Sequence, residues 1–361
     1  MTRGMTLGGW DTLGMLYREI KPYQKLTESF SEICIFTYGD SSDLVYSSLF
    51  PKNIKIITRL SFLPMFIYSF LLPFIHRAKL KNTQILKTNQ MDGSWAAVIA
   101  KKLYKNKLVV RCGYEWLQTL EKAKKSYLKR MFAIWAEKFA YSNADKIIFT
   151  SEDSKNFAVN KFKIELEKIS IIPNYIDTDL FKPLNINKEN GRIIFVGRLE
   201  QEKNLINLFM ALAGLNAKLV VVGRGSQEGE LKQLAQGKNL KVEFKGSIAQ
   251  SELPSELNKS EIFILPSVYE GNPKALLEAM ASGVACIGSN IPGIDYIIAG
   301  HKDGILCNTD VASIREAISL LLGNRELRVK LGASARRKIE AQNSFSVILN
   351  KEIEVYDQIL R

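Results

Sequence analysis

The sequence predicts an α/β protein built of two consecutive doubly wound domains, and three observations support this. Short apolar runs alternate with longer segments of helical periodicity through most of the 361-residue chain. This alternation is typical of parallel sheets covered by helices. It lapses over residues 173–191, where two prolines and a polar run indicate a linker. The length also suits two domains.

The first half is predicted to contain the strands and helices of one such domain. The strand candidates are 33–37, 54–58, 84–87, 108–111, 146–150 and 169–172. Helical periodicity separates many of them, over 95–104, 120–141 and 153–161. The run 60–75 is apolar but shorter than the roughly 20 residues that span a bilayer, and it contains Pro64 and Pro73. We expect it to form a buried or interfacial helix.

The second half resumes the alternation after the linker. Its strand candidates are 193–196, 219–222, 242–244, 262–265, 285–288 and 304–306. We therefore expect a first domain over 1–175, a second over 176–343, and a C-terminal helix over 344–361 that crosses back to the first domain. Two such domains imply a cleft, and sheets of this kind bind ligands at the carboxyl ends of their strands.

The composition is that of an ordinary globular protein, with 46% hydrophobic and 24% charged residues. The four cysteines, Cys34, Cys112, Cys286 and Cys307, are far apart and form no CxxC pair. This pattern favours reduced thiols in a cytoplasmic protein over a disulfide framework or a zinc site. Two histidines are too few for a histidine-rich metal centre.

Positive charge is concentrated in residues 77–139, which hold 15 lysines and arginines against 4 acidic residues. Such a field attracts phospholipid head groups, a diphosphate-linked lipid or nucleic acid, although it also serves solubility. Aromatic and basic side chains share the predicted helix 120–141, which suits peripheral attachment to an anionic membrane. The alternative is a helix packed on the sheet. No nucleic-acid recognition motif accompanies the charge, so we expect no nucleic-acid partner.

The richest segment follows the apolar run 262–265. A proline ends that run, a short loop carries Glu270, and a helix begins near Pro273 and carries Glu278. A strand–loop–helix junction presents free backbone N–H groups and the positive end of a helix dipole, which suit an anion. The flanking carboxylates suit hydroxyl groups. Each glutamate taken singly is more often structural, but together they predict a site for phosphate beside a polyol, as in a nucleotide sugar.

Two other strand ends carry related features. The run 193–196 ends on Gly197 and Arg198, with Lys203 near the start of the next helix, and these cations would neutralise a diphosphate. The run 219–222 ends on Gly223, which lets backbone approach a ligand closely. The glycines at 223, 225 and 229 with Glu243 also suggest a dinucleotide fingerprint, but the spacing departs from GxGxxG and follows the second strand of its domain.

Together these residues resemble the retaining glycosyltransferases of family 4, which have the GT-B architecture. The resemblance covers most of residues 140–340. The segment 173–183 is similar to the family's interdomain stretch, 196–205 to its phosphate-binding stretch, and 270–278 to its E-x7-E element. The first half matches more loosely.

The resemblance implies roles for these residues. Arg198 and Lys203 would hold the donor diphosphate beside Gly197 and Gly223. Glu278 would bind ribose hydroxyls, and Glu270 would contact the transferred sugar. The residues between them complete the donor site: Gly271, Asn272, Pro273, Lys274 and Ala275.

One departure from the family concerns the histidine that many members carry near the donor sugar, because neither histidine here follows a suitable strand end. Arg111, Tyr114 and Glu115 occupy a strand-end position instead, where they would contact donor or acceptor.

We therefore expect a glycosyltransferase that moves a sugar from a nucleotide-sugar donor to a saccharide or lipid-linked acceptor with retention, in surface polysaccharide or lipid-linked glycan synthesis. Front-face displacement needs no dedicated protein base. We expect no cofactor and no required metal, because cationic side chains already face the diphosphate. The stretch Asp177-Thr178-Asp179 spells a metal-like DxD, but its place in the linker favours a structural loop. The expected location is cytoplasmic, peripheral at the inner face of the cell membrane. The alternatives are an NAD-type oxidoreductase and a catalytically silent nucleotide-sugar binding protein.

The family resemblance also bears on the first residues. A GT-B first domain opens with a buried strand that ends in a glycine-rich turn, and residues 1–10 resemble that turn, followed by helical periodicity over 10–26. We expect the chain as given to begin after most of this strand. The alternative is that 33–37 is the first strand and the opening segment lies across the cleft, with Gly8 and Gly9 contacting acceptor or phosphate.

Overall fold

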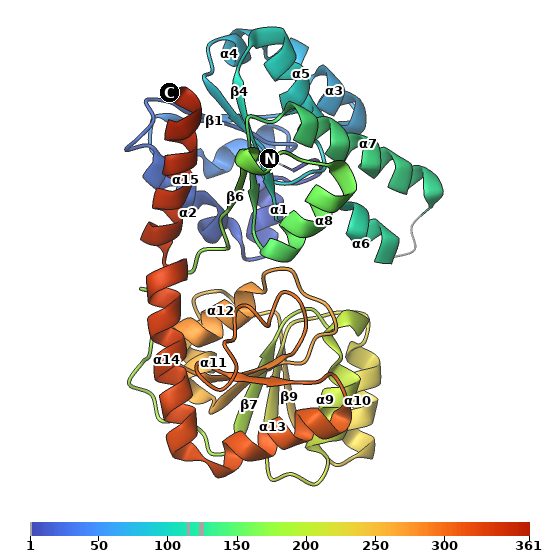
Figure 1. Cartoon of the computed structure of the whole chain (residues 1–361), viewed down its shortest axis with the longest axis vertical. Coiled ribbons are helices and arrows are strands. Elements are labelled where there is room, and N and C mark those ends of the chain that lie inside the picture. Colours follow the sequence, from blue (N-terminus) through green and yellow to red (C-terminus); the bar gives the residue numbers. More distant parts are fainter. Residues whose placement is uncertain (1, 114–115, 123–125) are drawn as a thin grey trace. The chain divides into compact units, whose positions relative to one another are not determined.

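The computed structural model describes residues 2–113, 116–122 and 126–361, and the chain divides into two compact units (Figure 1). The first unit runs to Ile172 and also includes the C-terminal stretch Leu349–Arg361. The second unit is Pro173–Ile348. The boundary between the units thus lies three residues before the one expected at 175. Most of the C-terminal helix belongs to the first unit, as expected.

The second unit is built on a six-stranded parallel sheet with the strand order β12-β11-β10-β7-β8-β9. Its strands are β7 (Arg192–Val196), β8 (Lys218–Val222), β9 (Lys241–Gly246), β10 (Ile262–Leu265), β11 (Ala285–Ser289) and β12 (Ile305–Cys307). Its helices are α9 (Leu205–Leu212), α10 (Glu228–Gly237), α11 (Leu253–Lys259), α12 (Lys274–Ala281), α13 (Val311–Gly323) and α14 (Arg325–Asn343), with the short 3-10 helix η3 (Gln201–Lys203). The central strand β10 is continuously apolar, and β7 is apolar after Arg192, because helices cover both faces of the sheet.

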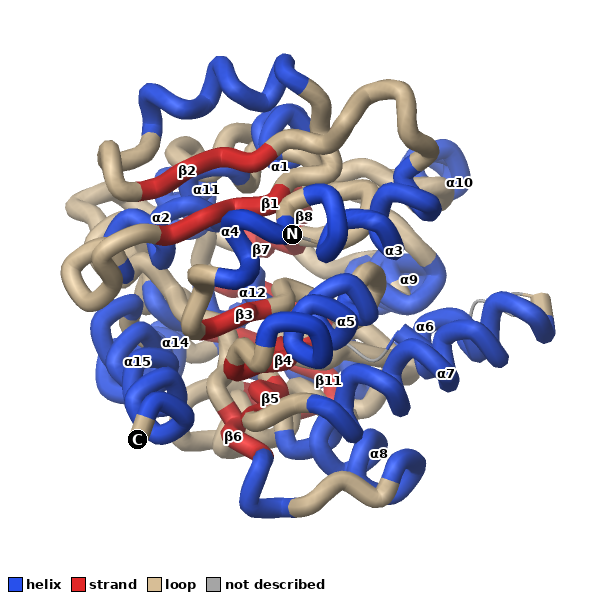
Figure 2. Tube along the Cα trace, turned by 90° about the horizontal axis from the view of Figure 1, so that it is seen from above, coloured by secondary structure: helices blue, strands red, loops and turns tan. Residues whose placement is uncertain are grey.

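The first unit contains two parallel sheets. One pairs β1 (Ile33–Phe36) with β2 (Ile54–Ile57), and the other has the order β3-β4-β5-β6. Figure 2 shows the strands of both sheets in one row. The remaining strands are β3 (Ile85–Lys87), β4 (Lys107–Cys112), β5 (Lys146–Phe149) and β6 (Ile169–Ile171). The helices are α1 (Leu7–Thr12), α2 (Leu16–Leu26), α3 (Met65–Ile75), α4 (Arg77–Lys81), α5 (Ser94–Tyr104), α6 (Trp116–Lys122), α7 (Tyr127–Asn143), α8 (Glu152–Phe162) and α15 (Phe345–Leu360), with the 3-10 helices η1 (Ser41–Leu49) and η2 (Leu166–Lys168).

Every predicted strand is present. Two segments that were each predicted to form a single helix form two helices instead. The first, over 10–26, is divided into α1 and α2 at Gly14, whose φ of +65° lies in the left-handed region. The second, over 120–141, is divided into α6 and α7, and Ser126 adopts a non-helical conformation immediately before α7.

The apolar run 60–75 forms a helix only from Met65, directly after Pro64. Tyr68 and Leu72 are buried, whereas Phe66, Ile67 and other apolar residues of α3 are exposed. The helix is therefore only half-buried, with apolar side chains exposed on its other face. In the part of the chain that is described, no helix is long and apolar enough to cross a membrane.

A buried ionic cluster attaches α15 to the first unit. The carboxylate of Glu352 pairs with Lys87 of β3, lies 3.7 Å from the guanidinium of Arg111 of β4, and accepts a hydrogen bond from Tyr356. Burial alone raises the pKa of Glu352, but the charges of Lys87 and Arg111 outweigh it and lower the pKa to about 2. The C-terminal helix is thus held by a carboxylate that stays ionised.

Candidate functional site

The candidate site lies at the carboxyl edge of the six-stranded sheet, where the order of the strands reverses. From β7 the chain proceeds through β8 and β9 on one side, and through β10, β11 and β12 on the other. Open parallel sheets bind ligands at such a switch point. The loops that follow β7 and β10 carry most of the residues that the sequence predicted.

These two loops meet in an ion pair. The Nζ atom of Lys203, which ends η3 after β7, lies 2.5 Å from Oε1 of Glu270, which follows β10. The same oxygen accepts a hydrogen bond from the fully buried hydroxyl of Ser267 at 2.7 Å. The two charged side chains are only 13% and 9% exposed. The structure thus brings together two residues that the sequence placed 67 positions apart and on separate strand ends.

Asn204 fixes the position of Lys203. Its backbone is left-handed, with φ of 56°, so η3 ends there and α9 begins. Its amide donates to the carbonyl of Pro266 at 3.1 Å and to that of Thr309 at 2.8 Å. Asparagine tolerates this conformation and supplies two donors, so it joins the loop after β7 to the loops after β10 and β12.

The segment that leads into α12 is held by side chains from elsewhere in the second unit. Asn272 accepts from the backbone N–H of Asn174 at 3.0 Å and donates to the hydroxyl of Tyr296 at 2.8 Å. That hydroxyl in turn donates to the carbonyl of Gly271 at 3.0 Å. Gly293 has φ of +92°, and a Cβ there would lie 2.3 Å from the carbonyl oxygen of Glu270. These contacts fix the direction from which α12 starts.

The amino end of α12 carries no side-chain cap. Pro273 is its N-cap residue, and Lys274 and Ala275 form its first turn. Helix N-termini without a cap present N–H donors and a partial positive charge, so they attract an oxyanion. This is the arrangement that the sequence predicted for the segment from Gly271 to Ala275.

Glu278 lies in the second turn of α12 and is 6% exposed. Its neighbours Leu277 and Ala279 are buried as well. The prediction that Glu278 is not a solvated helix residue is confirmed. Carboxylates are rarely buried unless they are paired or hydrogen bonded, so its burial needs a stabilising interaction.

Arg198 has a different environment from Lys203. Its side chain is 74% exposed and lies 2.9 Å from the carboxylate of Glu202, four residues later. Glu202 is also fixed by its backbone, because its carbonyl accepts from Val268 N–H. The loop after β7 therefore carries an exposed arginine and a largely buried lysine.

Gly197 and Gly223 bring the loops after β7 and β8 into contact. Gly223 has φ of +134°, and a Cβ there would lie 1.9 Å from the carbonyl oxygen of Gly197. The carboxylate of Glu200 then accepts from the backbone N–H and the hydroxyl of Ser226 at 3.0 Å and 2.6 Å. These hydrogen bonds, the hydroxyl's first, lower the pKa of Glu200. The structure thus gives Gly223 a close approach to protein backbone, where the sequence suggested approach to a ligand.

The dinucleotide fingerprint does not match this geometry. A Cβ on Gly225 would lie 2.3 Å from the carbonyl of Leu199, so protein fills the space beside it. Glu243 lies within β9 and pairs with Lys218 and Lys245, and hydrogen bonds from these lysines lower its pKa to about 2. A ribose-binding acid would have to lie at the carboxyl end of its strand.

The predicted residues of the first unit are engaged by protein. The N–H of Gly8 donates to Asp43 at 3.0 Å, and the N–H of Gly9 donates to Thr6 at 2.7 Å, so neither is open to a phosphate. Arg111 belongs to the cluster around Glu352. Tyr114 and Glu115 lie outside the described residues.

His76 caps α3, where its ring lies 2.9 Å from the hydroxyl of Tyr68. Burial lowers its pKa. The contacts of His76 are therefore those of a residue that stabilises the fold.

The DxD-like stretch forms a turn. The carboxylate of Asp177 accepts from the backbone N–H of Asp179 and of Leu180, at 3.3 Å and 3.4 Å. An aspartate that bonds its own backbone two residues on is a common turn former. This agrees with the interpretation of the stretch as a structural loop.

The sequence did not single out Ser267, Glu202, Asn204 or Tyr296. Ser267, Glu202 and Asn204 could have been found from their place in the sequence. Each lies just after a strand or beside the predicted cation Lys203, where a polar side chain can hold a charged group in position. Tyr296 could not have been found in this way, because its contact with Asn272 depends on a distant loop.

Family comparison covers most of the chain in two parts. Residues 25–180 match the family described as Glycosyltransferase Family 4, and residues 177–338 match the family described as Glycosyl transferases group 1. The two matches meet within the predicted linker.

Two bacterial proteins are similar in sequence. The UDP-Gal:alpha-D-GlcNAc-diphosphoundecaprenol alpha-1,3-galactosyltransferase of Escherichia coli is 28% identical over 248 residues, which are 63% of this chain and 63% of that protein. The N,N'-diacetylbacillosaminyl-diphospho-undecaprenol alpha-1,3-N-acetylgalactosaminyltransferase of Campylobacter jejuni is 27% identical over 74% of each chain. The chain thus spans less than two thirds of the first relative's length and about three quarters of the second's.

Among solved structures, sucrose-phosphate synthase of Thermosynechococcus elongatus superimposes with a TM-score of 0.80 at 20% identity, over 96% of this chain and 93% of that one. A likeness at this identity shows the fold. The predicted GT-B fold class, with two Rossmann-like domains, is confirmed.

Proposed function

Because the chain belongs to the glycosyltransferases, carrying the family 4 and group 1 domains in succession, we propose that it transfers a sugar from a nucleotide-sugar donor to an acceptor with retention. One observation carries the proposal. Lys203 and Glu270 meet at the switch point of the second sheet, directly before the uncapped amino end of α12. Cation, carboxylate and helix end are the groups that a sugar diphosphate requires side by side.

The donor would replace contacts that the protein makes with itself. Lys203 and Arg198 are each paired with a carboxylate, Glu270 and Glu202. A diphosphate that approaches both cations frees Glu270 for hydroxyl groups of the transferred sugar. Arg198 can reorient readily because most of its side chain is exposed, and exposed ion pairs are weak. Glu278 would bind the ribose hydroxyls.

The proposed reaction is a front-face displacement. The bond between the anomeric carbon and the donor phosphate oxygen breaks, and a bond from that carbon to the acceptor oxygen forms on the same face. The acceptor's proton passes to the departing phosphate, so no separate protein base is required. Negative charge develops on the diphosphate, and Lys203, Arg198 and the α12 amides stabilise it more in the transition state than in the ground state.

We propose that no divalent metal is needed, because cationic side chains already supply the charge that a metal would supply. Activity should persist in excess EDTA. Loss of activity in EDTA with recovery on adding magnesium or manganese would contradict this part.

The names of the relatives support a narrower choice of substrates. One relative is named for UDP-galactose and for a diphosphoundecaprenol-linked sugar, and another for a diphospho-undecaprenol-linked sugar. We propose a uridine diphosphate sugar as donor and a sugar on a diphosphate-linked lipid as acceptor, in surface polysaccharide or lipid-linked glycan synthesis. The net charge of +11 over residues 77–139 supports an anionic, lipid-linked acceptor.

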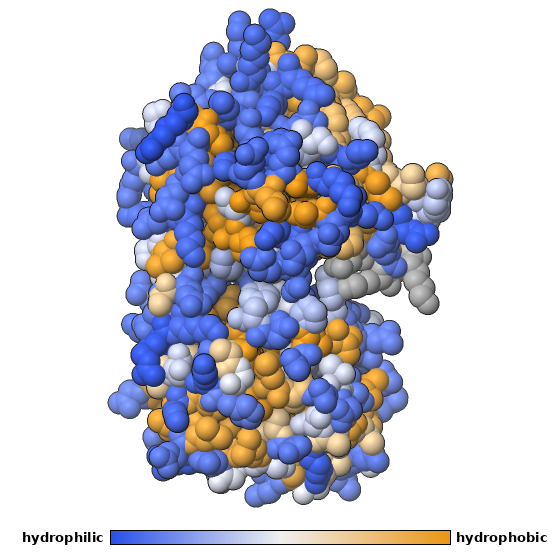
Figure 3. Space-filling view, in the orientation of Figure 1, coloured by the Kyte–Doolittle hydropathy of each residue, from blue (hydrophilic) through white to orange (hydrophobic). Residues whose placement is uncertain are grey.

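A surface on the first unit supports attachment to the inner face of the cell membrane. Phe66 of α3 and Phe132 of α7 have ring centroids 5.7 Å apart, so these helices form one surface. Its exposed apolar residues are Met65, Phe66, Ile67, Leu71, Phe74 and Ile75 of α3 with Tyr127, Leu128, Met131 and Trp135 of α7. Figure 3 shows apolar side chains gathered over α3. Such residues beside lysines and arginines suit an anionic bilayer surface.

The test of the donor proposal is a thermal-shift screen of nucleotide sugars, followed by detection of released nucleotide with each sugar that binds. We expect a uridine diphosphate sugar to raise the unfolding temperature and to be hydrolysed slowly in the absence of acceptor. Binding without turnover, even with lipid-linked acceptors, would favour the catalytically silent alternative. A shift with NAD and none with nucleotide sugars would favour the oxidoreductase.

A further inference from the structure

The segment that leads into α12 is bound to the linker at one residue, Asn174. The amide Nδ2 of Asn174 donates to the backbone carbonyl of Asn272 at 2.9 Å, and the backbone N–H of Asn174 donates to Oδ1 of Asn272 at 3.0 Å. The side chain of each asparagine thus binds the backbone of the other, across 98 positions of sequence. Such a reciprocal pair fixes both the distance and the rotation between two segments, whereas a single hydrogen bond leaves the rotation free.

The carbonyl of Gly271, one residue before Asn272, is held by a different side chain. The hydroxyl of Tyr296 donates to this carbonyl at 3.0 Å and accepts from Nδ2 of Asn272 at 2.8 Å. The two carbonyls that precede Pro273 therefore each have a partner from elsewhere in the second unit. A trans peptide unit is planar, with its C=O and N–H pointing in opposite directions, so a fixed carbonyl also fixes the N–H that follows it. The backbone that enters α12 is thus oriented by residues outside it.

Asn174 is itself held by the last residue of α14. Nδ2 of Asn343 donates to the carbonyl of Asn174 at 3.1 Å, and the carbonyl of Asn343 accepts from the N–H of Ile176 at 2.8 Å. Asn343 is buried, and Ile176 forms a parallel bridge with Ser344. Asn174 is therefore a fixed point against which the segment before α12 is aligned.

The linker is also joined to the carboxyl end of α12. The guanidinium of Arg336, on α14, donates to the carbonyl of Ala281, the last residue of α12, at 2.9 Å. It also donates to the linker carbonyls of Thr178 and Phe181, at 3.1 Å and 2.6 Å. Because α12 is tied at this end as well, loss of the Asn174 side chain should turn the amino end of the helix without detaching the helix.

We propose that Asn174 is a positioning residue for the second phosphate of the donor, the one that carries the transferred sugar. The amino end of α12 attracts an oxyanion, and its N–H groups stabilise that charge only when they are aimed correctly. Asn174 does not touch the donor but acts through Asn272, whose carbonyl it fixes. The second phosphate is singled out because Glu270, the residue proposed to contact the sugar, lies on the same segment. The inference rests on the proposed function, since it requires a nucleoside diphosphate at this helix end.

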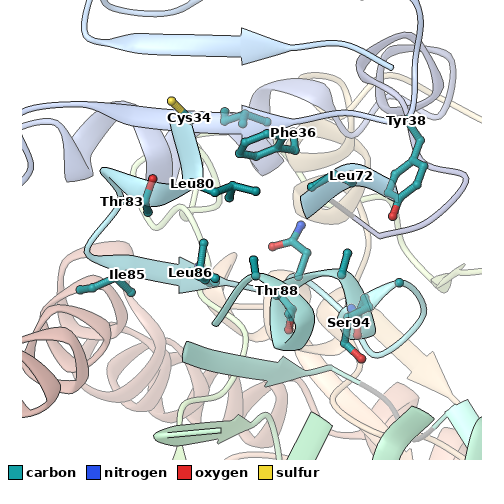
Figure 4. A pocket seen from close by; sticks show the side chains of 18 of the residues that line it. Cys34, Phe36, Tyr38, Leu72, Leu80, Thr83, Ile85, Leu86, Thr88 and Ser94 are labelled. Atoms are coloured by element: carbon teal, nitrogen blue, oxygen red, sulfur yellow. The ribbon is translucent and has the colours of Figure 1, made fainter. Parts of the chain in front are cut away.

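The cavity of about 200 Å³ in the first unit does not suit this phosphate (Figure 4). Phe36, Leu80 and Leu86 are among its apolar lining residues. Lys87 is the one charged side chain among the described residues that line the cavity, and it is paired with Glu352. A diphosphate would lose water there without gaining an unengaged cation. Affinity that depends on the second phosphate is therefore not expected to arise from this cavity.

The experiment is calorimetric titration of UDP and of UMP into the full chain and its variants. Asn174→Ala removes the donor to the Asn272 carbonyl but keeps both backbone contacts of residue 174. Tyr296→Phe removes the hydroxyl that holds the Gly271 carbonyl, and this side chain is exposed, so its packing changes little. If Asn174→Ala does not fold, Asn174→Asp takes its place, because an ionised carboxylate has the shape of the amide but cannot donate.

Asn258→Ala is the matched control. Nδ2 of Asn258, in α11, donates to the linker carbonyl of Lys182 at 3.0 Å, and its Oδ1 accepts from the linker N–H of Leu184 at 2.8 Å. The control thus removes side-chain bonds to the same linker, but at α11 instead of α12. Asn258 is also buried and donates to Pro254, so this variant should lower the unfolding midpoint at least as much as Asn174→Ala.

We expect the wild type and Asn258→Ala to bind UDP at least tenfold more tightly than UMP. Asn174→Ala and Tyr296→Phe should each reduce this preference about fivefold or more, with the affinity for UMP nearly unchanged. A wild-type preference in Asn174→Ala, or an equal loss of preference in Asn258→Ala, would overturn the inference and leave the proposed function standing. No preference for UDP in the wild type would overturn the proposed function and the inference with it.

Discussion

At the scale of single residues, the two glutamates of the second unit should have separable effects. Glu278→Gln removes the negative charge proposed to bind ribose hydroxyls, and a charge-assisted hydrogen bond contributes about 1.5–3 kcal/mol. We expect KM for the donor to rise about tenfold or more with kcat nearly kept. Glu270→Gln should mainly lower kcat, because Glu270 is proposed to contact the transferred sugar.

Steady-state kinetics with a common donor distinguishes the two glutamate variants. Glu252→Gln is the matched control, since this exposed glutamate lies before α11, away from the switch point. Unchanged kinetics in both site variants would contradict the assignment of the E-x7-E element.

Asn204 should act as a positioning residue. Asn204→Gly keeps the left-handed backbone available but removes the two hydrogen bonds to Pro266 and Thr309. We expect kcat/KM to fall about tenfold, with the unfolding midpoint changed by only a few degrees. Asn239→Gly is the control, because Asn239 is also left-handed, with φ of 50°, and follows α10. Equal activity of the two variants would show that Asn204 serves the fold alone.

The sequence predicted several of the residues of the site but not the contacts among them. Lys203, Glu270 and Glu278 were found because chemistry at strand ends has a recognisable local pattern. Their pairing depends on β7 and β10 being neighbours, which strand order along the chain does not reveal. The same limit applies to Arg111, whose partner Glu352 is 241 positions later, in α15.

At the scale of elements, the attachment of α15 should depend on pH. Glu352 has its pKa lowered from 4.5 to about 2, so its ion pairs stabilise the folded state above pH 4.5. That stabilisation is lost as the pH falls from about 4.5 towards 2. In this range the carboxyl group of Glu352 takes up a proton in the unfolded chain but stays ionised in the folded one, which favours unfolding. Unfolding of the first unit should therefore become easier across this range.

Glu352→Gln tests this dependence. The variant leaves Lys87 and Arg111 without their carboxylate, and breaking a buried pair from one side costs about 3–5 kcal/mol. Denaturant unfolding at pH 7 should show a loss of that order, and the loss should shrink towards pH 2. Glu354→Gln, on an exposed position of the same helix, is the control. A constant difference at all pH values would contradict the role of the ionised carboxylate.

Helix continuity was the least predictable property of the elements. The periodicity over 10–26 is real, but Gly14 allows a left-handed residue that separates α1 from α2. The strands were predictable because each is a short apolar run buried within a parallel sheet. Pairing was not predictable, so the separation of β1–β2 from β3–β6 came only from the structure.

At the scale of the whole molecule, binding to membranes should require both apolar contact and charge. We expect the protein to sediment with vesicles that contain anionic lipid, and to do so less as salt is added, because the Debye length is about 8 Å near physiological ionic strength. Leu128→Gln with Trp135→Gln, on the exposed face of α7, should weaken binding.

Val329→Gln is the control for the vesicle measurement, since this exposed apolar residue belongs to α14 of the second unit. Equal sedimentation with neutral and anionic vesicles would contradict the electrostatic part of the account.

The central claim is that Lys203 and its neighbours at the switch point bind the diphosphate of a nucleotide sugar. Calorimetric titration of UDP, UMP and uridine into the wild-type protein and into Lys203→Met tests it most directly, with Lys218→Met as the control, because Lys218 pairs with Glu243 on another part of the sheet. We predict that the wild type and the control bind UDP at least tenfold more tightly than uridine, and that Lys203→Met loses most of this preference. Equal preference for UDP in Lys203→Met and the wild type, or no preference in the wild type, would contradict the account.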